Sequence, residues 1–146
     1  MHHDLTFETD RFNLSEVKEH FINPCCFGED LAGWLRDKLL EKGLEATQPD
    51  QEDWGWYIEA NYRGDWYFIG IGGNADEFGK NNNQGEWRIM VEKYRSVWEK
   101  LTQKNEMSEA EEMMNLIREV LEMEPDFNNV RYEDGAPAKS LKQTGN

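Results

Sequence analysis

The sequence predicts a single α+β domain, in which an antiparallel sheet of four to five strands is packed by two main helices. Three observations lead to this prediction. A chain of 146 residues has the size of one domain. Two segments, 28–43 and 108–124, repeat apolar residues at helical spacing. Between them, several short segments alternate apolar and polar residues, which is typical of strands with one buried face.

The N-terminal third is expected to hold one strand and the first main helix. Residues 4–14 predict a strand, because alternate apolar side chains share one face. The segment 15–21 predicts one or two helical turns. In 28–43, four large apolar residues form one stripe of a helix, and Gly43 suits a C-terminal stop. The stripe consists of Leu31, Trp34, Leu35 and Leu39.

The middle of the chain predicts an antiparallel meander of three strands. These strands are expected at 55–62, 65–71 and 86–93. Arg63-Gly64 separates the first two and suits a tight hairpin turn. The glycine- and asparagine-rich segment 72–85 is expected to be a loop.

The C-terminal part predicts the second main helix and a last short strand. Ser108 and Glu111 have the spacing of a capping box at the start of the helix 108–124. A strand is expected at 127–132. Residues 133–146 lack apolar periodicity and are expected to form a flexible tail. The single domain is therefore expected to span residues 1–132.

The composition narrows the class of partner. The formal net charge is −14, which disfavours binding to a nucleic-acid backbone or an anionic membrane. It favours a basic protein as partner, or mimicry of nucleic acid; acidity that serves only solubility is the plain alternative. No apolar run is long enough to span a bilayer, and the N-terminus lacks the pattern of a secretory signal.

The two cysteines, Cys25 and Cys26, are adjacent. Neighbouring cysteines do not build a disulfide scaffold, so the sequence predicts a cytoplasmic protein. They precede a helix N-terminus, where a thiol pKa is lowered, and His20 is the one interior histidine that could act as a base. Inert thiols are the preferred interpretation. Neither a zinc site nor any cofactor is expected, since the Cys and His spacing does not match one.

The stretch EDWGWY, at residues 52–57, carries the first candidate binding site. Glu52, Asp53 and Trp54 are predicted to form an exposed rim that contacts a basic partner by ion pairs and cation–π contacts. Alternation predicts Trp54 and Trp56 on the same face of an extended chain. The structural alternative is that Trp56 is core and Trp54 covers a sheet edge or a helix end.

The second candidate site is on the second main helix. Residues 97–134 hold 11 acidic against 4 basic residues, a local charge of −7. Glu111, Glu112 and Glu119 are predicted to contact the partner, because an acidic surface steers a cationic protein into place. An ordinary solvated helix face is the alternative.

Two runs of sequence carry a resemblance. NPCCFGEDLAGWL and PDQEDWGWYIE resemble a pattern of small uncharacterised bacterial α+β proteins, in which a G-E-D helix precedes an E-D-W-G-W strand. In size, acidity and α+β pattern, the chain is also similar in type to bacterial toxin-immunity proteins. The resemblance implies no catalytic residue.

These observations predict a non-enzymatic protein that captures or neutralises a basic partner. Two alternatives stay open. One is an enzyme or small-ligand binder with a pocket lined by tryptophans; the other is a nucleic-acid mimic, which needs carboxylates spaced like phosphates. The pocket would be lined by Trp34, Trp56, Trp66 and Trp87.

Overall fold

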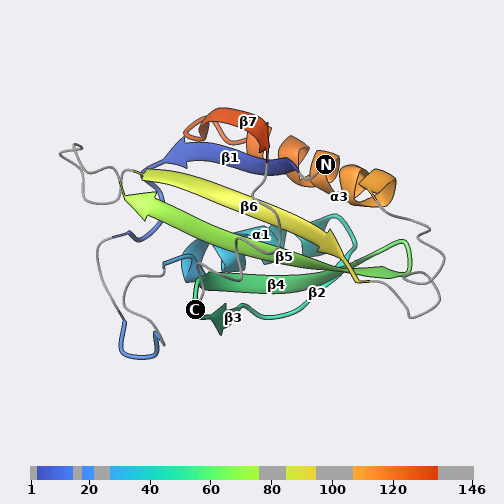
Figure 1. The fold of residues 1–146 in the computed structure, drawn as a ribbon, viewed down its shortest axis with the longest axis horizontal. Helices are drawn as coiled ribbons and strands as arrows, with labels where there is room; N and C mark the ends of the chain where they lie inside the picture. Colours follow the sequence, from blue (N-terminus) through green and yellow to red (C-terminus); the bar gives the residue numbers. More distant parts are fainter. Residues whose placement is uncertain (1–2, 15–17, 22–26, 76–84, 95–106, 135–146) are drawn as a thin grey trace.

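A computed structural model describes residues 3–14, 18–21, 27–75, 85–94 and 107–134. The described residues form two helices and one antiparallel sheet of seven strands (Figure 1). The α+β class is therefore confirmed, whereas the predicted count of four to five strands is too low. The strands are β1 (His3–Thr9), β2 (Glu45–Ala46), β3 (Asp50–Glu52), β4 (Gly55–Tyr62), β5 (Asp65–Ala75), β6 (Gly85–Lys93) and β7 (Asn128–Asp134). The helices are α1 (Glu29–Glu41) and α3 (Met107–Glu122).

The sheet has the strand order β2-β4-β5-β6-β1-β7, and β3 also pairs with β4. The predicted meander is its centre, formed by β4, β5 and β6. The first strand, β1, lies between β6 and the last strand, β7. The last strand therefore pairs with the first, and β1 is hydrogen-bonded to a neighbouring strand along both edges.

The predicted turns at Arg63-Gly64 and Gly43 are confirmed. Arg63 and Gly64 both have positive φ, at 56° and 90°, as a two-residue hairpin of the twisted β4–β5 pair requires. Gly43 has φ 89° and follows α1, and the next residue, Leu44, donates its N–H to the Leu39 carbonyl at 3.0 Å. The Leu39 carbonyl also accepts from the Lys42 N–H at 3.1 Å, so the carbonyl groups at the end of the helix are satisfied within the turn.

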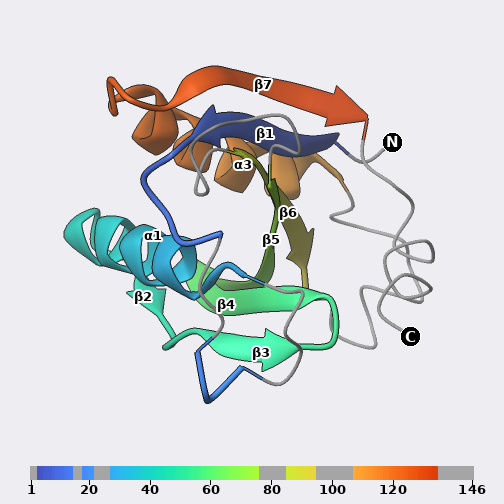
Figure 2. The same cartoon turned by 90° about the vertical axis from the view of Figure 1, so that its left-hand side faces the viewer.

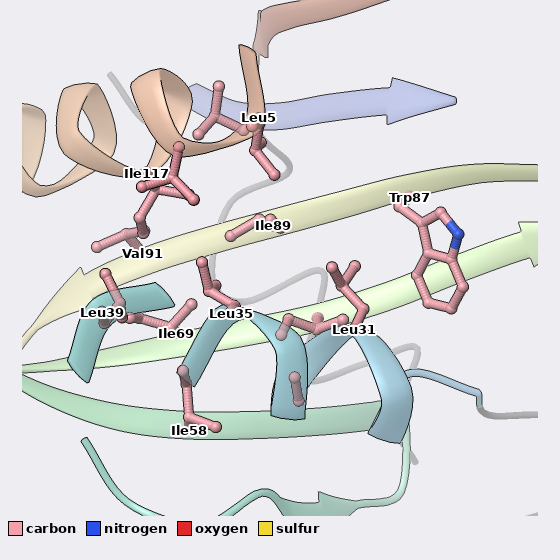
Figure 3. Packing of buried hydrophobic residues seen from close by; sticks show 14 of the residues in the cluster. Leu5, Leu31, Leu35, Leu39, Ile58, Ile69, Trp87, Ile89, Val91 and Ile117 are labelled. Carbon is pink, nitrogen blue, oxygen red and sulfur yellow. The ribbon is translucent and has the colours of Figure 1, made fainter. Parts of the chain in front are cut away.

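Both helices lie on one face of the sheet. Figure 2 shows the sheet curving around α1 and α3. The face toward the helices carries the apolar side chains, and Figure 3 shows Leu31, Leu35 and Leu39 of α1 in one layer with Ile58 and Ile69 of the strands. All five of these side chains have 0% exposure. We call the opposite face of the sheet the outer face; no helix in the described part of the chain covers it.

Several elements differ from the prediction in extent. β2 and β3 were not predicted, because they are two and three residues long, are partly exposed and overlap a turn-like sequence. β5 continues to Ala75, through glycines that the sequence suggested were loop. A Cβ on Gly73 would lie 2.6 Å from the Trp87 ring, so this glycine makes room for the indole.

The final strand also exceeds its expected end. β7 runs through Glu133 and Asp134, two residues into the predicted tail. The predicted capping contact of Ser108 and the first part of the predicted turn at 15–21 lie outside what the structure describes.

Candidate binding surface

The stretch EDWGWY forms the hairpin between β3 and β4. Glu52 pairs with Gly55, and Asp53 and Trp54 form the turn between them. A turn interrupts the alternation of a strand, so Trp54 and Trp56 lie on opposite faces of the sheet, and the prediction of a shared face is wrong. Trp56 belongs to the core, with 3% exposure.

Trp54 folds onto the outer face above β5. A Cβ built on Gly70 would meet the Trp54 ring at 2.7 Å and the ends of Met90 and Phe68 at 3.2 Å. The glycine therefore provides the space in which the indole lies. Gly55 likewise leaves no space for a side chain, because a Cβ there would be 2.5 Å from the carbonyl oxygen of Ile71.

Four rings gather on the outer face, and we call them the aromatic cluster. Its members are Trp54, Tyr57, Phe68 and Tyr94. Phe68 is the centre: its ring stacks on Tyr57 at 5.0 Å and meets Trp54 and Tyr94 at 6.0 and 6.4 Å with near-perpendicular planes. Both geometries are favourable for aromatic pairs. Tyr94 keeps 46% of its surface exposed, and its cross-strand neighbour Trp66 keeps 38%.

Carboxylates surround the aromatic cluster, and we call them the acidic rim. The rim consists of Asp50, Glu52, Glu59 and Glu92. Glu59 and Glu92 are the two cross-strand partners of Phe68, one on each side. Among the described residues, no carboxylate of the rim forms an ion pair. The rim is therefore negative charge that the described part of the chain does not neutralise.

The rim affects the two tyrosines of the cluster. Burial, followed by the charges of Asp50, Glu52 and Glu59, raises the pKa of Tyr57. Burial and a hydrogen bond to Glu59 raise the pKa of Tyr94. Both phenols therefore stay protonated at neutral pH and remain hydrogen-bond donors beside carboxylates.

On the rest of the outer face, arginines of the chain itself form ion pairs with the carboxylates. Arg88 donates to Asp4 at 2.8 Å and to Glu133 at 2.9 Å. Arg131 contacts Glu133 at 2.9 Å and Glu86 at 2.7 Å. These ion pairs cover β6, β1 and β7, where the Asp4 side chain is only 2% exposed. The outer face is thus divided between a paired, polar half and an aromatic, unpaired half.

The six predicted contact residues do not form one surface. Glu52, Asp53 and Trp54 share the β3–β4 hairpin, beside the aromatic cluster. Glu111, Glu112 and Glu119 are exposed on α3, which packs against the other face of the sheet. Glu112 pairs with Arg63 at 3.1 Å, at the far end of β4. That strand has eight residues, so roughly 25 Å separates the two groups.

The four tryptophans of the alternative pocket do not come together in the described part of the chain. Trp87 is fully buried and Trp56 nearly so, whereas Trp66 lies on the outer face. Trp34 packs at the edge of the core, 5.1 Å from the Phe127 ring. In the described part of the chain, a hollow of about 210 Å³ lies elsewhere, between the C-terminal ends of α1 and α3 beside Lys38 and Met123.

Of the three residues considered for cysteine chemistry, the structure describes only His20. His20 is exposed and lies 2.7 Å from Glu29 in the first turn of α1. Cys25 and Cys26 lie outside the described residues. Within those residues no group of three or more His, Cys, Asp or Glu is placed to hold a metal ion. No described helix is long and apolar enough to cross a membrane.

Comparison with known proteins does not assign this chain to a family. No family model, curated protein or solved structure matches this chain. The resemblance of its G-E-D and E-D-W-G-W segments to small bacterial proteins, and its likeness in type to immunity proteins, therefore stay predictions.

The sequence did not single out most of the surface that the structure assembles. Phe68 and Glu92 come from segments that were expected only to be strands, and Tyr94 follows directly after the strand expected at 86–93. In the strand expected at 55–62, alternation is enough to put Tyr57 and Glu59 on the face opposite Trp56, as the structure has them. The missing information was the register that brings Phe68 between Glu59 and Glu92.

Proposed function

We propose that this chain is an acidic, non-enzymatic binding protein that captures a basic protein partner, as an immunity-type protein of the cytoplasm would. The observation that carries the proposal is the aromatic cluster enclosed by the acidic rim. Tyr94 is exposed and the other three rings are half-buried. Partly exposed rings and carboxylates without ion pairs in one place are complementary to a surface that presents arginine or lysine. A basic protein neutralises the rim and buries the rings at the same time.

The two parts of the surface have different tasks. The rim, together with the net charge of −14, attracts a cationic partner and speeds its association. The rings supply the apolar area that a few central residues usually contribute to a protein interface. Trp54, Tyr57 and Phe68 are held by one another, so little side-chain freedom is lost when a partner binds.

The helix α3 offers a second acidic surface, which the sequence also predicted as a contact. Arg63 and Arg118 already lie near its carboxylates, with Arg118 donating to Glu122 at 3.0 Å. No exposed ring cluster accompanies Glu111, Glu112 and Glu119 in the described part of the chain. We therefore place the partner on the outer face rather than on α3.

Two matched variants test this choice. One carries Glu52→Gln, Glu59→Gln and Glu92→Gln; the other carries Glu111→Gln, Glu112→Gln and Glu119→Gln. Both lose three negative charges, so they differ only in the surface that is changed. Each immobilised protein is exposed to lysate of the cells that encode it, at low and at high salt, and the retained proteins are identified by mass spectrometry.

The proposal expects the wild type to retain a basic protein at low salt and to retain less of it at high salt. The outer-face variant should lose that protein, and the α3 variant should keep it. Equal retention by the two variants would contradict the outer face as the binding surface. Retention of acidic proteins only would contradict the proposed class of partner.

A further inference from the structure

The described part of the chain contains three places where an arginine, an aromatic ring and a carboxylate meet. The Arg11 guanidinium lies 4.5 Å from the centre of the Phe127 ring and donates to Glu124 at 2.7 Å. It also donates to Asp126 through Nε at 2.9 Å. One planar guanidinium thus covers a ring and binds two carboxylates.

The other two places repeat this arrangement at the surface. The Arg63 guanidinium lies 5.0 Å from the Tyr62 ring and 3.1 Å from Glu112. The Arg118 guanidinium lies 5.2 Å from the Tyr132 ring. Within the described residues, arginine is therefore the cation that this fold combines with a ring and a carboxylate at hydrogen-bond distance.

Lysine makes looser contacts in the same chain. The Lys38 ammonium is 5.9 Å from the Trp34 ring and 3.8 Å from Glu41. This difference follows from the chemistry, because the guanidinium is planar and carries five donors in a fixed fork, whereas the ammonium is a compact charge that stays strongly hydrated.

The aromatic cluster and the acidic rim provide two of the three components found at those places, a ring and carboxylates. Among the described residues, no arginine completes the arrangement there. Glu59 and Glu92 lie on the strands to either side of Phe68, with their Cα atoms about 10 Å apart. Tyr94, with its exposed ring, lies one cross-strand pair further along the same face. A guanidinium that lies on this ring has carboxylates on both sides.

We propose that this part of the outer face is an arginine-recognition site, in which one guanidinium of the partner lies on the Tyr94 ring and donates to Glu92 and Glu59. The inference rests on the proposed function and specifies the residue that the partner must present. Arginine is selected over lysine because only the planar fork serves the ring and two carboxylates together.

Two synthetic probes separate arginine recognition from general attraction of positive charge. One is a hexapeptide of arginine and the other a hexapeptide of lysine, both with blocked termini. Their affinities for the full chain are measured at low salt by calorimetry. We expect the arginine peptide to bind about five- to tenfold more tightly, which corresponds to roughly 1 to 1.4 kcal/mol.

The variants Glu92→Gln and Tyr94→Leu should reduce this preference to less than about twofold. Glu119→Gln on α3 removes the same charge as Glu92→Gln and should leave the preference unchanged. Glu92, Tyr94 and Glu119 are exposed in the structure, so the variants are expected to fold, which circular dichroism verifies.

The outcomes distinguish the two proposals. Equal affinity for both peptides, weakened equally by the triple outer-face variant, would overturn arginine recognition and leave the basic-partner proposal standing. A preference for arginine that survives both Glu92→Gln and Tyr94→Leu would overturn the assigned site. Binding of neither peptide would overturn the arginine site, and the proposed function would then be decided by the capture experiment with the two triple variants.

Discussion

Substituting Gly55 by alanine tests whether the EDWGWY hairpin is built as described. The new Cβ would be 2.5 Å from the Ile71 carbonyl oxygen, whereas an ordinary carbon–oxygen contact is about 3.3 Å. The two strands must therefore separate by roughly 0.8 Å at this point. The Cβ is bonded directly to the backbone of β4 and the oxygen belongs to the backbone of β5, so no change of rotamer relieves the contact.

The size of the effect follows from two opposing terms. Overpacking of this kind costs about 1–3 kcal/mol. Replacing glycine by alanine returns about 0.4–1 kcal/mol, because the unfolded chain loses freedom. We expect Gly55→Ala to lower the free energy of unfolding by about 1–2 kcal/mol.

Gly72→Ala is the matched control. It lies on the neighbouring strand, its φ is likewise outside the positive region, and no atom lies within 4 Å of the Cβ position. It should be neutral or stabilising by up to about 1 kcal/mol. Thermal unfolding followed by circular dichroism should separate the two variants by roughly 6 °C. A Gly55→Ala variant that melts at or above Gly72→Ala would refute the close approach of β4 to Ile71.

Three further predictions concern charge. Arg88→Met should destabilise the protein by about 1–3 kcal/mol in urea unfolding, because it leaves the buried Asp4 carboxylate without its cation. Adding Asp4→Asn should restore part of the lost stability. If it restores none, Arg88 does not act by compensating the charge of Asp4. The hydrogen bond from Arg11 lowers the pKa of Asp126 in the folded protein. The ion pair therefore stabilises the fold fully above the pKa of about 4 that Asp126 has in the unfolded chain, and this stabilisation is lost as the pH falls through the lower pKa of the folded state. The stability difference between wild type and Arg11→Met should therefore shrink in acid, and a constant difference would show that only packing is lost. Finally, the ultraviolet difference titration between wild type and Tyr57→Phe should show a phenol pKa above 10.0, since burial and nearby carboxylates raise it; a midpoint at or below that value would exclude the described surroundings.

The sequence predicts well those parts of the fold that depend on local chemistry. The apolar stripe of α1 and its stop at Gly43 require only helical spacing and a residue that tolerates positive φ. Likewise, Arg63-Gly64 suits a two-residue turn by itself. These features appear in the structure where the sequence predicts them, because no distant residue is needed to specify them.

The features that were not predicted depend on distant partners. β2 and β3 have too few residues for alternation, and their pairing with β4 gives them their extended form. The role of Gly73 is visible only once Trp87 lies above it. In the same way, the face on which Trp54 lies follows from the turn at Asp53 and the space above Gly70.

The division of the outer face connects the fold to the proposed function. Where the sheet buries Asp4, the fold needs a cation, and Arg88 supplies it from the neighbouring strand. Around Phe68, Glu92 is exposed and Glu59 is half-buried, so water still reaches both carboxylates and the isolated protein tolerates them without a cation at little cost. Their mutual repulsion and the exposed rings are nevertheless small penalties that a bound guanidinium would remove together. The surface is therefore stable enough to exist alone and more stable when neutralised from outside, and this difference is what a binding site for a basic partner requires.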